Sequence, residues 1–246
     1  MKTFRLIISE AAYATYNMEL DEKIFSRFLE DRIPVFRVYR WARPAFTYGA
    51  YQNPEAEIDL KQCALDGVEV VKRITGGGIL FHHDEITYSF VCDKTDVGEP
   101  SNVFVSYREI CAFLINFYAS LGLKTNFALE SKDFKHKSAS SELCSNSYEK
   151  YDILINGKKI GGNAQKRKRQ VIFQHGSIPM SIDWNFVRRY IKNLPLDIAI
   201  SVTSLSEELG LIPEKDIIEQ KLVDSFSSAF GIEFIEESFC VIARSA

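Results

Sequence analysis

The dipeptide Asn156-Gly157 constrains the fold of this chain most, because it separates two short runs of β-type residues. Residues 151–155 and 158–160 flank it, and Asn-Gly is the preferred two-residue turn between antiparallel strands. A β-hairpin is therefore expected over residues 151–160. At least part of the sheet in this chain should then be antiparallel.

Other segments carry the patterns of strands and helices. Runs of branched and aromatic residues predict strands, and apolar residues at spacings of three and four predict helices. We expect further strands at 35–40, 46–48, 68–73, 86–91, 124–129, 171–178 and 232–240, and helices at 10–30, 54–65, 103–121, 183–190 and 213–230. Strands cluster and do not alternate regularly with helices, which favours an α+β fold with a central mixed or antiparallel β-sheet flanked by helices.

The domain organisation follows from what separates these segments. The 246 residues contain no internal repeat and no linker rich in proline and glycine. A chain of this length buries roughly 70–75% of its unfolded surface, so it can build one large core or two modest ones. A single domain over residues 1–246 is expected, and residues 185–246 are the candidate for a small C-terminal subdomain.

Charge and cysteine content exclude several classes of protein. Thirty Lys and Arg residues against 33 Asp and Glu leave a net charge of −3, whereas nucleic-acid binders are usually strongly basic. The five cysteines show no CxxC spacing, which argues against a disulfide framework and against a zinc site. Neither a signal peptide nor a membrane-spanning run is recognisable. We expect a cytoplasmic protein with no nucleic-acid partner and no membrane insertion.

A glycine run at residues 76–78 follows an expected strand and Arg73. Glycines without Cβ atoms let backbone N–H groups approach the oxygens of a phosphate or carboxylate. The run matches neither the Walker nor the Rossmann pattern, so a tight turn without a ligand is an equally good interpretation. The polar residues 82–85, which begin with His82 and His83, favour a binding site slightly.

The same polar residues also raise the question of a metal site. Histidine and carboxylate side chains do bind metals, but the HExxH spacing is absent, and adjacent residues of a strand point to opposite faces. Only His136 and His175 remain as further histidines. No metal site is therefore expected, and one of the two adjacent histidines should face a pocket while the other meets solvent.

Lys159 is the second candidate for chemistry, because it ends a hairpin strand just before Gly161-Gly162. An ammonium aimed into a cleft there could stabilise a carboxylate, a phosphate or a thioester carbonyl that gains negative charge. A solvent-exposed hairpin lysine is the commoner situation. The basic residues 166–169 fit an exposed tip, or a surface that docks an acidic partner.

Four segments together resemble the lipoate/biotin protein ligase superfamily. Residues 73–82 are similar to its arginine, glycine and histidine motif, and residues 157–167 to its lysine motif. Residues 174–178 and 17–21 are similar to the strand that follows and to the first helix of the family. The resemblance implies a fold like that of class II synthetases and biotin–lipoate ligases. It also implies substrate-binding roles for Arg73, Thr75, Gly76, Gly77, Gly78, His82, Gly162, Asn163, Ala164, His175 and Gly176.

Within that superfamily the chain looks most like the octanoyltransferase branch that shares the ligase scaffold. Residues 85–89, 165–167 and 174–179 are similar to that branch, and Cys144 stands where the branch carries its nucleophile. Cys92 and Cys111 fall in a strand and a helix, where small core residues are expected. Gly78 departs from the branch, which often has arginine there, and a run of three glycines is more typical of ligases.

The resemblance implies a reaction and its participants. Octanoyl-acyl carrier protein would acylate Cys144 while Lys159 stabilises the oxyanion, and the octanoyl group would pass to a lysine of an apo lipoyl domain of a 2-oxoacid dehydrogenase or of glycine cleavage H protein. No cofactor is then required. The alternative is a lipoate–protein ligase, which would use ATP and Mg and no cysteine, and a third reading is a binding module without turnover. The acyl pocket is expected near Ile74, Leu80 and Tyr88, with Arg73 and His82 either supporting the turn or contacting the donor.

Overall fold

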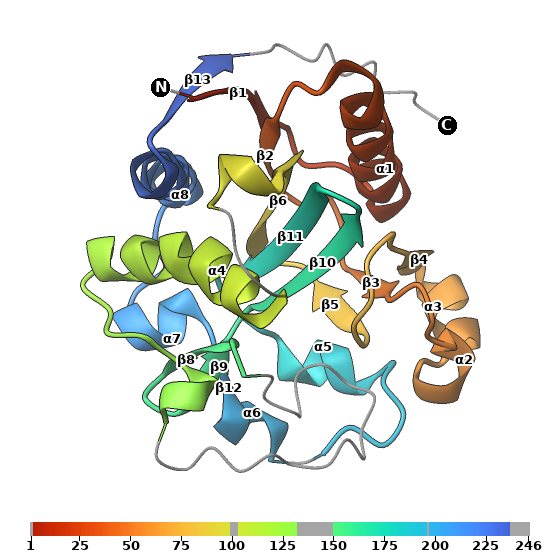
Figure 1. Ribbon diagram of the computed structural model, residues 1–246. Coiled ribbons are helices and arrows are strands. Elements are labelled where there is room, and N and C mark those ends of the chain that lie inside the picture. Colours follow the sequence, from red (N-terminus) through yellow and green to blue (C-terminus); the bar gives the residue numbers. More distant parts are fainter. Residues whose placement is uncertain (1, 99–102, 132–149, 196, 237–246) are drawn as a thin grey trace.

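The central element of the fold is a six-stranded mixed sheet (Figure 1). The computed structural model describes residues 2–98, 103–131, 150–195 and 197–236. In sheet order the strands are β10 (Gly162–Lys168), β11 (Val171–Pro179), β6 (Glu85–Asp93), β2 (Val35–Tyr39), β1 (Lys2–Ile8) and β13 (Ile232–Glu236). The first four pair antiparallel, and β1 runs parallel to both of its neighbours. The expected α+β fold with a central mixed sheet flanked by helices is confirmed.

Two smaller sheets lie beside the central one. One contains β12 (Val202–Thr203), β9 (Lys158–Ile160), β8 (Ile153–Ile155) and β7 (Asn126–Phe127) in that order. The other contains β4 (Glu69–Lys72), β3 (Ala45–Tyr48) and β5 (Leu80–His82). Strands β12 and β13 both lie in the segment 185–246 and join sheets formed by earlier parts of the chain.

Helices cover both faces of the central sheet. Helix α1 (Ala14–Asp31) packs on one face against the strand residues Val35 and Phe173, while α4 (Val103–Ser120) and α8 (Lys215–Phe230) pack on the other against Phe36 and Ile172. Successive residues of a strand point to opposite faces, so neighbours such as Val35 and Phe36 enter different cores. This alternation explains why the central strands are apolar throughout.

Several segments differ from the sequence expectation in their limits. The helix expected at 54–65 is two helices, α2 (Pro54–Glu57) and α3 (Leu60–Asp66), because the side chains of Asn53 and Asp59 each cap a separate start. Strand β1 and the full length of β10 were not expected. The strand expected at 124–129 is short and continues into a 3-10 turn, Ala128–Glu130.

The Asn156-Gly157 hairpin is confirmed. Asn156 and Gly157 have φ of 50° and 80°, and two positive φ values are what a type I′ turn requires. Strands β8 and β9 pair antiparallel across this turn. The remaining short helices are α5 (Trp184–Arg188), α6 (Ile198–Ser201) and α7 (Leu205–Leu209). Among the described helices, none is both long and apolar enough to span a membrane.

Candidate functional site

The glycine turn joins β4 to β5 and is built around the Arg73 guanidinium. Arg73 donates hydrogen bonds to the carbonyl oxygens of Gly76 and Gly78, at 3.0 and 2.6 Å. Gly77 has φ of 92°, a backbone conformation that favours glycine. Two carbonyl groups of the turn therefore face inward to Arg73. The sequence predicts that Arg73 either supports the turn or contacts the donor, and these hydrogen bonds show that it supports the turn.

His82 is buried between a carboxylate and a hydroxyl. Its Nδ1 lies 2.9 Å from Oε1 of Glu85, and its Nε2 lies 2.7 Å from Oγ1 of Thr47. The Trp41 ring stacks on the imidazole with ring centroids 4.0 Å apart. Burial raises the pKa of Glu85, but His82 and the adjacent hydroxyl donors offset this and hold that pKa below its ordinary value. Since Thr47 also accepts from Arg73 through its carbonyl oxygen, His82 links Glu85 to the glycine turn.

His175 forms a second link of the same kind on β11. Its Nε2 lies 2.7 Å from Oγ1 of Thr75, and its Nδ1 lies 3.7 Å from Oδ2 of Asp21. Burial lowers the pKa of His175, so the imidazole is neutral near pH 7. Burial raises the pKa of Asp21, but Arg37, 2.8 Å away, the nearby His175 imidazole and a hydrogen bond from Ser89 hold it below its ordinary value. The glycine turn is thus tied to α1 and β2 through buried charges.

Gly176 lies at a close approach of three strands. A Cβ there would be 2.2 Å from Oδ1 of Asn163 and 2.5 Å from Cε1 of Tyr88. The Tyr88 hydroxyl donates to Oδ1 of Asn163 at 2.6 Å, and the Tyr107 hydroxyl donates to the Asn163 carbonyl at 2.5 Å. The amide oxygen of Asn163 is therefore bound by the protein itself, and only glycine fits at position 176.

Two pockets lie next to these residues. The narrow pocket has a volume of about 10 Å³ and lies among residues that the sequence motifs predicted: Arg73, His82, Ala164, His175 and Gly176, together with Met18, Tyr39 and Trp41. The wide pocket has a volume of about 100 Å³ and largely apolar walls: Phe46, Ile79, Phe81, Trp184, Val187 and Ile191. Both pockets are also lined by Leu80, Gly162 and Ser177, so they meet at these residues.

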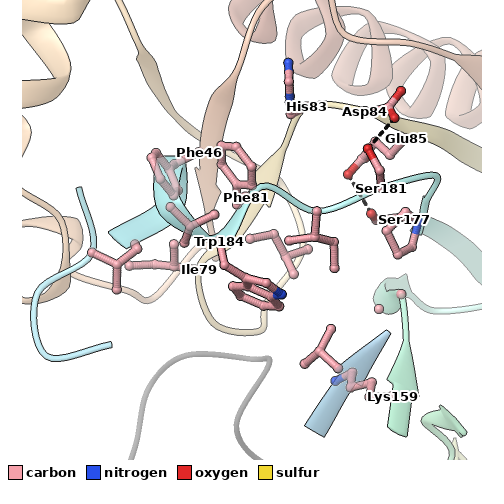
Figure 2. Close-up of a pocket in the computed structure, with 18 residues that line it drawn as sticks. Phe46, Ile79, Phe81, His83, Asp84, Glu85, Lys159, Ser177, Ser181 and Trp184 are labelled. Atoms are coloured by element: carbon pink, nitrogen blue, oxygen red, sulfur yellow. Dashed lines mark hydrogen bonds between the residues drawn. The ribbon is translucent and has the colours of Figure 1, made fainter. Parts of the chain in front are cut away.

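The polar groups of the wide pocket gather at one of its ends. Figure 2 shows the rings of Phe46 and Phe81 on one side and Glu85, Ser177 and Lys159 on the other. Ser177 donates to Glu85 at 2.7 Å. This polar end adjoins the junction with the narrow pocket.

Lys159 lines the wide pocket and is buried, with 5% of its surface exposed. Its Nζ lies 2.7 Å from Oδ2 of Asp152 on the neighbouring strand. Lys158 points to the opposite face of β9, where its half-exposed ammonium lies 3.8 Å from Glu207. A charge as buried as that of Lys159 requires a partner, and Asp152 supplies one while the ammonium stays next to the pocket.

The sequence suggests that the glycine turn forms part of the wall of a binding pocket. Gly76, Gly77 and Gly78 are absent from the described lining of both pockets. Of the expected acyl-pocket residues, Leu80 lines both pockets, Ile74 packs with the apolar cluster under α1, and Tyr88 is buried in the core beneath α4. The strand that holds Tyr88 contributes Glu85 and Thr87 to the pocket walls, although Ile74 and Tyr88 themselves are absent from the described lining.

The cysteines separate into two groups. Cys63, Cys92 and Cys111 are buried and free, and burial raises the thiol pKa of Cys63 to about 11 and of Cys111 to about 12. Such thiols carry almost no thiolate at neutral pH, which confirms Cys92 and Cys111 as core residues. Cys144, the expected nucleophile, lies outside the described residues.

Several residues of the site carried no motif in the sequence. Arg37 and Thr47 belong to strands, and Trp184 and Val187 belong to the helix expected at 183–190, with Ile191 just beyond it. One signal was available for Arg37, because an arginine within the apolar run 35–39 indicates a buried charge that requires partners. Among the described His, Cys, Asp and Glu side chains, no three gather as metal ligands would.

Comparison with known proteins places the chain in a family. Residues 13–230 match the lipoyl protein ligase A/B catalytic domain, so the chain belongs to this family. Octanoyltransferase LipM of Clostridioides difficile is 29% identical over 245 residues, which cover 96% of this chain and 90% of the relative. Octanoyltransferase LipM of Kyrpidia tusciae is 31% identical over 245 residues, 94% of this chain and 88% of the relative. These names support the octanoyltransferase expectation over the ligase alternative.

Solved structures agree on the fold. Protein Ta0514 of T. acidophilum, solved with bound lipoic acid, superimposes with a TM-score of 0.76 at 22% identity, over 96% of this chain and 89% of that one. A lipoate-protein ligase A bound with ATP gives the same TM-score, identity and coverage. The expected similarity to the ligase fold is confirmed.

Proposed function

We propose that this protein is an octanoyltransferase of protein lipoylation that acts in the cytoplasm as a single catalytic domain over residues 1–246. It moves an octanoyl group from acyl carrier protein to a lysine of an apo lipoyl domain of a 2-oxoacid dehydrogenase or of glycine cleavage H protein. The relatives named octanoyltransferase support this activity. The observation that carries the proposal is the buried Lys159 ammonium at the wide pocket, next to the junction of the two pockets.

The two-pocket arrangement suits a thioester. A thioester has an alkyl chain on one side of its carbonyl carbon and the sulfur of the donor on the other. With the carbonyl at Leu80, Gly162 and Ser177, where the pockets meet, each side can occupy one pocket. Lys159 then lies where the carbonyl oxygen acquires negative charge during attack, and a positive charge there stabilises the transition state.

The first half of the proposed reaction acylates the enzyme. The Cys144 thiolate attacks the octanoyl carbonyl carbon, the new C–S bond forms, and the bond to the sulfur of the carrier breaks. The carrier leaves as a thiolate and takes up a proton. Lys159, held by Asp152, stabilises the tetrahedral oxyanion between these two events.

The second half transfers the octanoyl group to the acceptor. The neutral ε-amine of the acceptor lysine attacks the octanoyl-Cys144 carbonyl, the C–N bond forms, and the Cys144 thiolate leaves while the nitrogen loses a proton. An amide is more stable than a thioester, so the transfer is downhill without ATP or another cofactor.

Intact-mass spectrometry after mixing with octanoyl-acyl carrier protein tests the mechanism. The wild type should gain one octanoyl group, and the adduct should disappear when an apo lipoyl domain is added. Cys144→Ala should gain none, whereas Cys63→Ala should acquire the adduct normally, because its thiol is buried. A Cys144→Ala protein that still transfers octanoate from the carrier at the wild-type rate would refute the thioester mechanism.

The same assay separates the two alternatives. A lipoate–protein ligase would modify the acceptor only with ATP and free octanoate or lipoate, and Cys144→Ala would leave that activity unchanged. A binding module would retain the acceptor domain and transfer nothing from either donor. Either result would contradict the proposed function and support the corresponding alternative.

A further inference from the structure

An unpartnered donor in the wide pocket leads beyond the transfer reaction itself. The indole Nε1–H of Trp184 is buried, and among the residues that the structure describes it has no hydrogen-bond partner. Figure 2 shows the indole nitrogen turned toward the end of the pocket that holds Lys159 and Ser177. A buried tryptophan N–H normally has an acceptor, so a ligand in this pocket is expected to supply one.

The rest of the Trp184 side chain is fixed by packing. The indole packs against the apolar cluster that contains Phe46, Val187 and Ile191. Asp183, the residue before it, caps α5 by accepting from two backbone N–H groups at the helix start. The direction of the N–H is therefore set before any ligand arrives.

The participants in the proposed function differ in whether they can accept this hydrogen bond. An alkyl chain has no acceptor. The one lone pair on the neutral ε-amine of the acceptor lysine is used in the attack on the carbonyl carbon. The thioester carbonyl is already assigned to Lys159. The remaining acceptors belong to the pantetheine arm through which a carrier protein holds an acyl group, since that arm contains two amide carbonyls separated by apolar carbons.

We infer that the wide pocket binds the pantetheine arm of the acyl donor, with the Trp184 indole N–H donating to one of its amide carbonyls. The apolar walls of this pocket suit the carbon segments of the arm. The alkyl chain then occupies the narrow pocket, where Met18 can move to widen it because its side chain is unbranched and flexible. This assignment rests on the proposed function and makes Trp184 a determinant of donor specificity.

The test compares two donors and two variants. Octanoyl-pantetheine carries both amides, whereas the octanoyl thioester of 2-mercaptoethanol carries none. Trp184→Phe keeps an aromatic ring and removes the N–H. With octanoyl-pantetheine its kcat/KM should therefore fall about fivefold below that of the wild type. With the short thioester its kcat/KM should equal that of the wild type. Phe81→Leu, in the same pocket, is the matched control, because it removes apolar contact and no hydrogen bond.

Each outcome has a distinct meaning. Equal losses with both donors would assign the indole to packing or to the thioester carbonyl and would overturn the inference. A Trp184→Phe defect confined to the KM of the acceptor domain would also overturn it. If the wild type transfers octanoate neither from the two thioesters nor from octanoyl-acyl carrier protein, the proposed function fails. If the wild type is active and Trp184→Phe is equally active with both donors, only the inference about Trp184 fails.

Discussion

The narrow and the wide pocket differ in what their polar side chains bind. In the narrow pocket, Arg73 binds carbonyl groups of the glycine turn, and His82 and His175 are each held between a carboxylate and a threonine hydroxyl. In the wide pocket, the Asp152 carboxylate holds Lys159 at the edge of an apolar cavity. The Trp184 N–H faces that cavity and has no hydrogen-bond partner among the described residues. The comparison teaches that the polar motif residues of the narrow pocket bind one another and the glycine turn and so form a rigid wall, whereas Lys159 and Trp184 lie at the edge of an apolar cavity.

Loss of Lys159 should have the largest effect. Lys159→Met should reduce the rate of acyl transfer about 100- to 1,000-fold, as removal of one oxyanion donor does in other enzymes. The variant also leaves Asp152 buried without its ammonium, which costs about 3–5 kcal/mol of stability. Transfer rates and urea unfolding measure the two effects separately.

Two controls make this prediction specific. The double variant Lys159→Met/Asp152→Asn should recover stability and remain inactive, because the carboxylate charge is gone as well. Lys158→Ala should keep wild-type activity, since Lys158 faces away from the pocket. An active double variant would show that the wide pocket does not supply the oxyanion contact.

The wall of the narrow pocket can be tested at Gly176. Gly176→Ala should lower the free energy of unfolding by about 1–3 kcal/mol, because the new Cβ would overlap Asn163 and Tyr88. Gly76→Ala is the control, since a Cβ there would meet nothing within 4 Å. Thermal unfolding of both variants provides the measurement, and equal melting temperatures would contradict the rigid-wall description.

The neutral His175 predicts a pH dependence of stability. Its folded pKa lies below its unfolded value of about 6.5, so protons bind the unfolded state more tightly and stability falls as pH drops below about 6.5 toward the folded pKa. His175→Gln should weaken the loss of stability between pH 7.5 and 5, measured by urea unfolding at a series of pH values. His83→Gln, at an exposed position, should retain the wild-type profile, and an unchanged profile in His175→Gln would argue against a buried neutral imidazole.

Acyl-chain preference should respond to the narrow pocket alone. Met18→Ala enlarges that pocket and should raise the ratio of kcat/KM for decanoyl over octanoyl donors about 15-fold, the effect of burying the two further methylene groups. Ile191→Ala is a comparable truncation in the wide pocket and should leave the ratio unchanged. The opposite result would exchange the ligands assigned to the two pockets.

The elements with strong local signals were predictable from the sequence. The Asn156-Gly157 hairpin, α1 and α8 follow from turn chemistry and helical periodicity, which depend on neighbouring residues. Strand β1 was not predicted, because a short apolar run at a chain end has no turn signal, and its pairing with β2 and β13 involves residues up to 230 positions away. Residues 166–168 of the basic segment extend β10 for the same reason, since β11 supplies their pairing partners.

The sequence by itself determined the family, the fold class and the residues that carry the resemblance, because these depend on local patterns and on the order of motifs. Only the tertiary structure decided which of these residues meet a ligand. It turned Arg73 to the glycine turn and Lys159 to a pocket, and it brought Trp184 to the same pocket from a segment without a motif. The physical reason is that a buried polar group takes whichever partner the packing places beside it, and packing joins residues that are far apart in the chain.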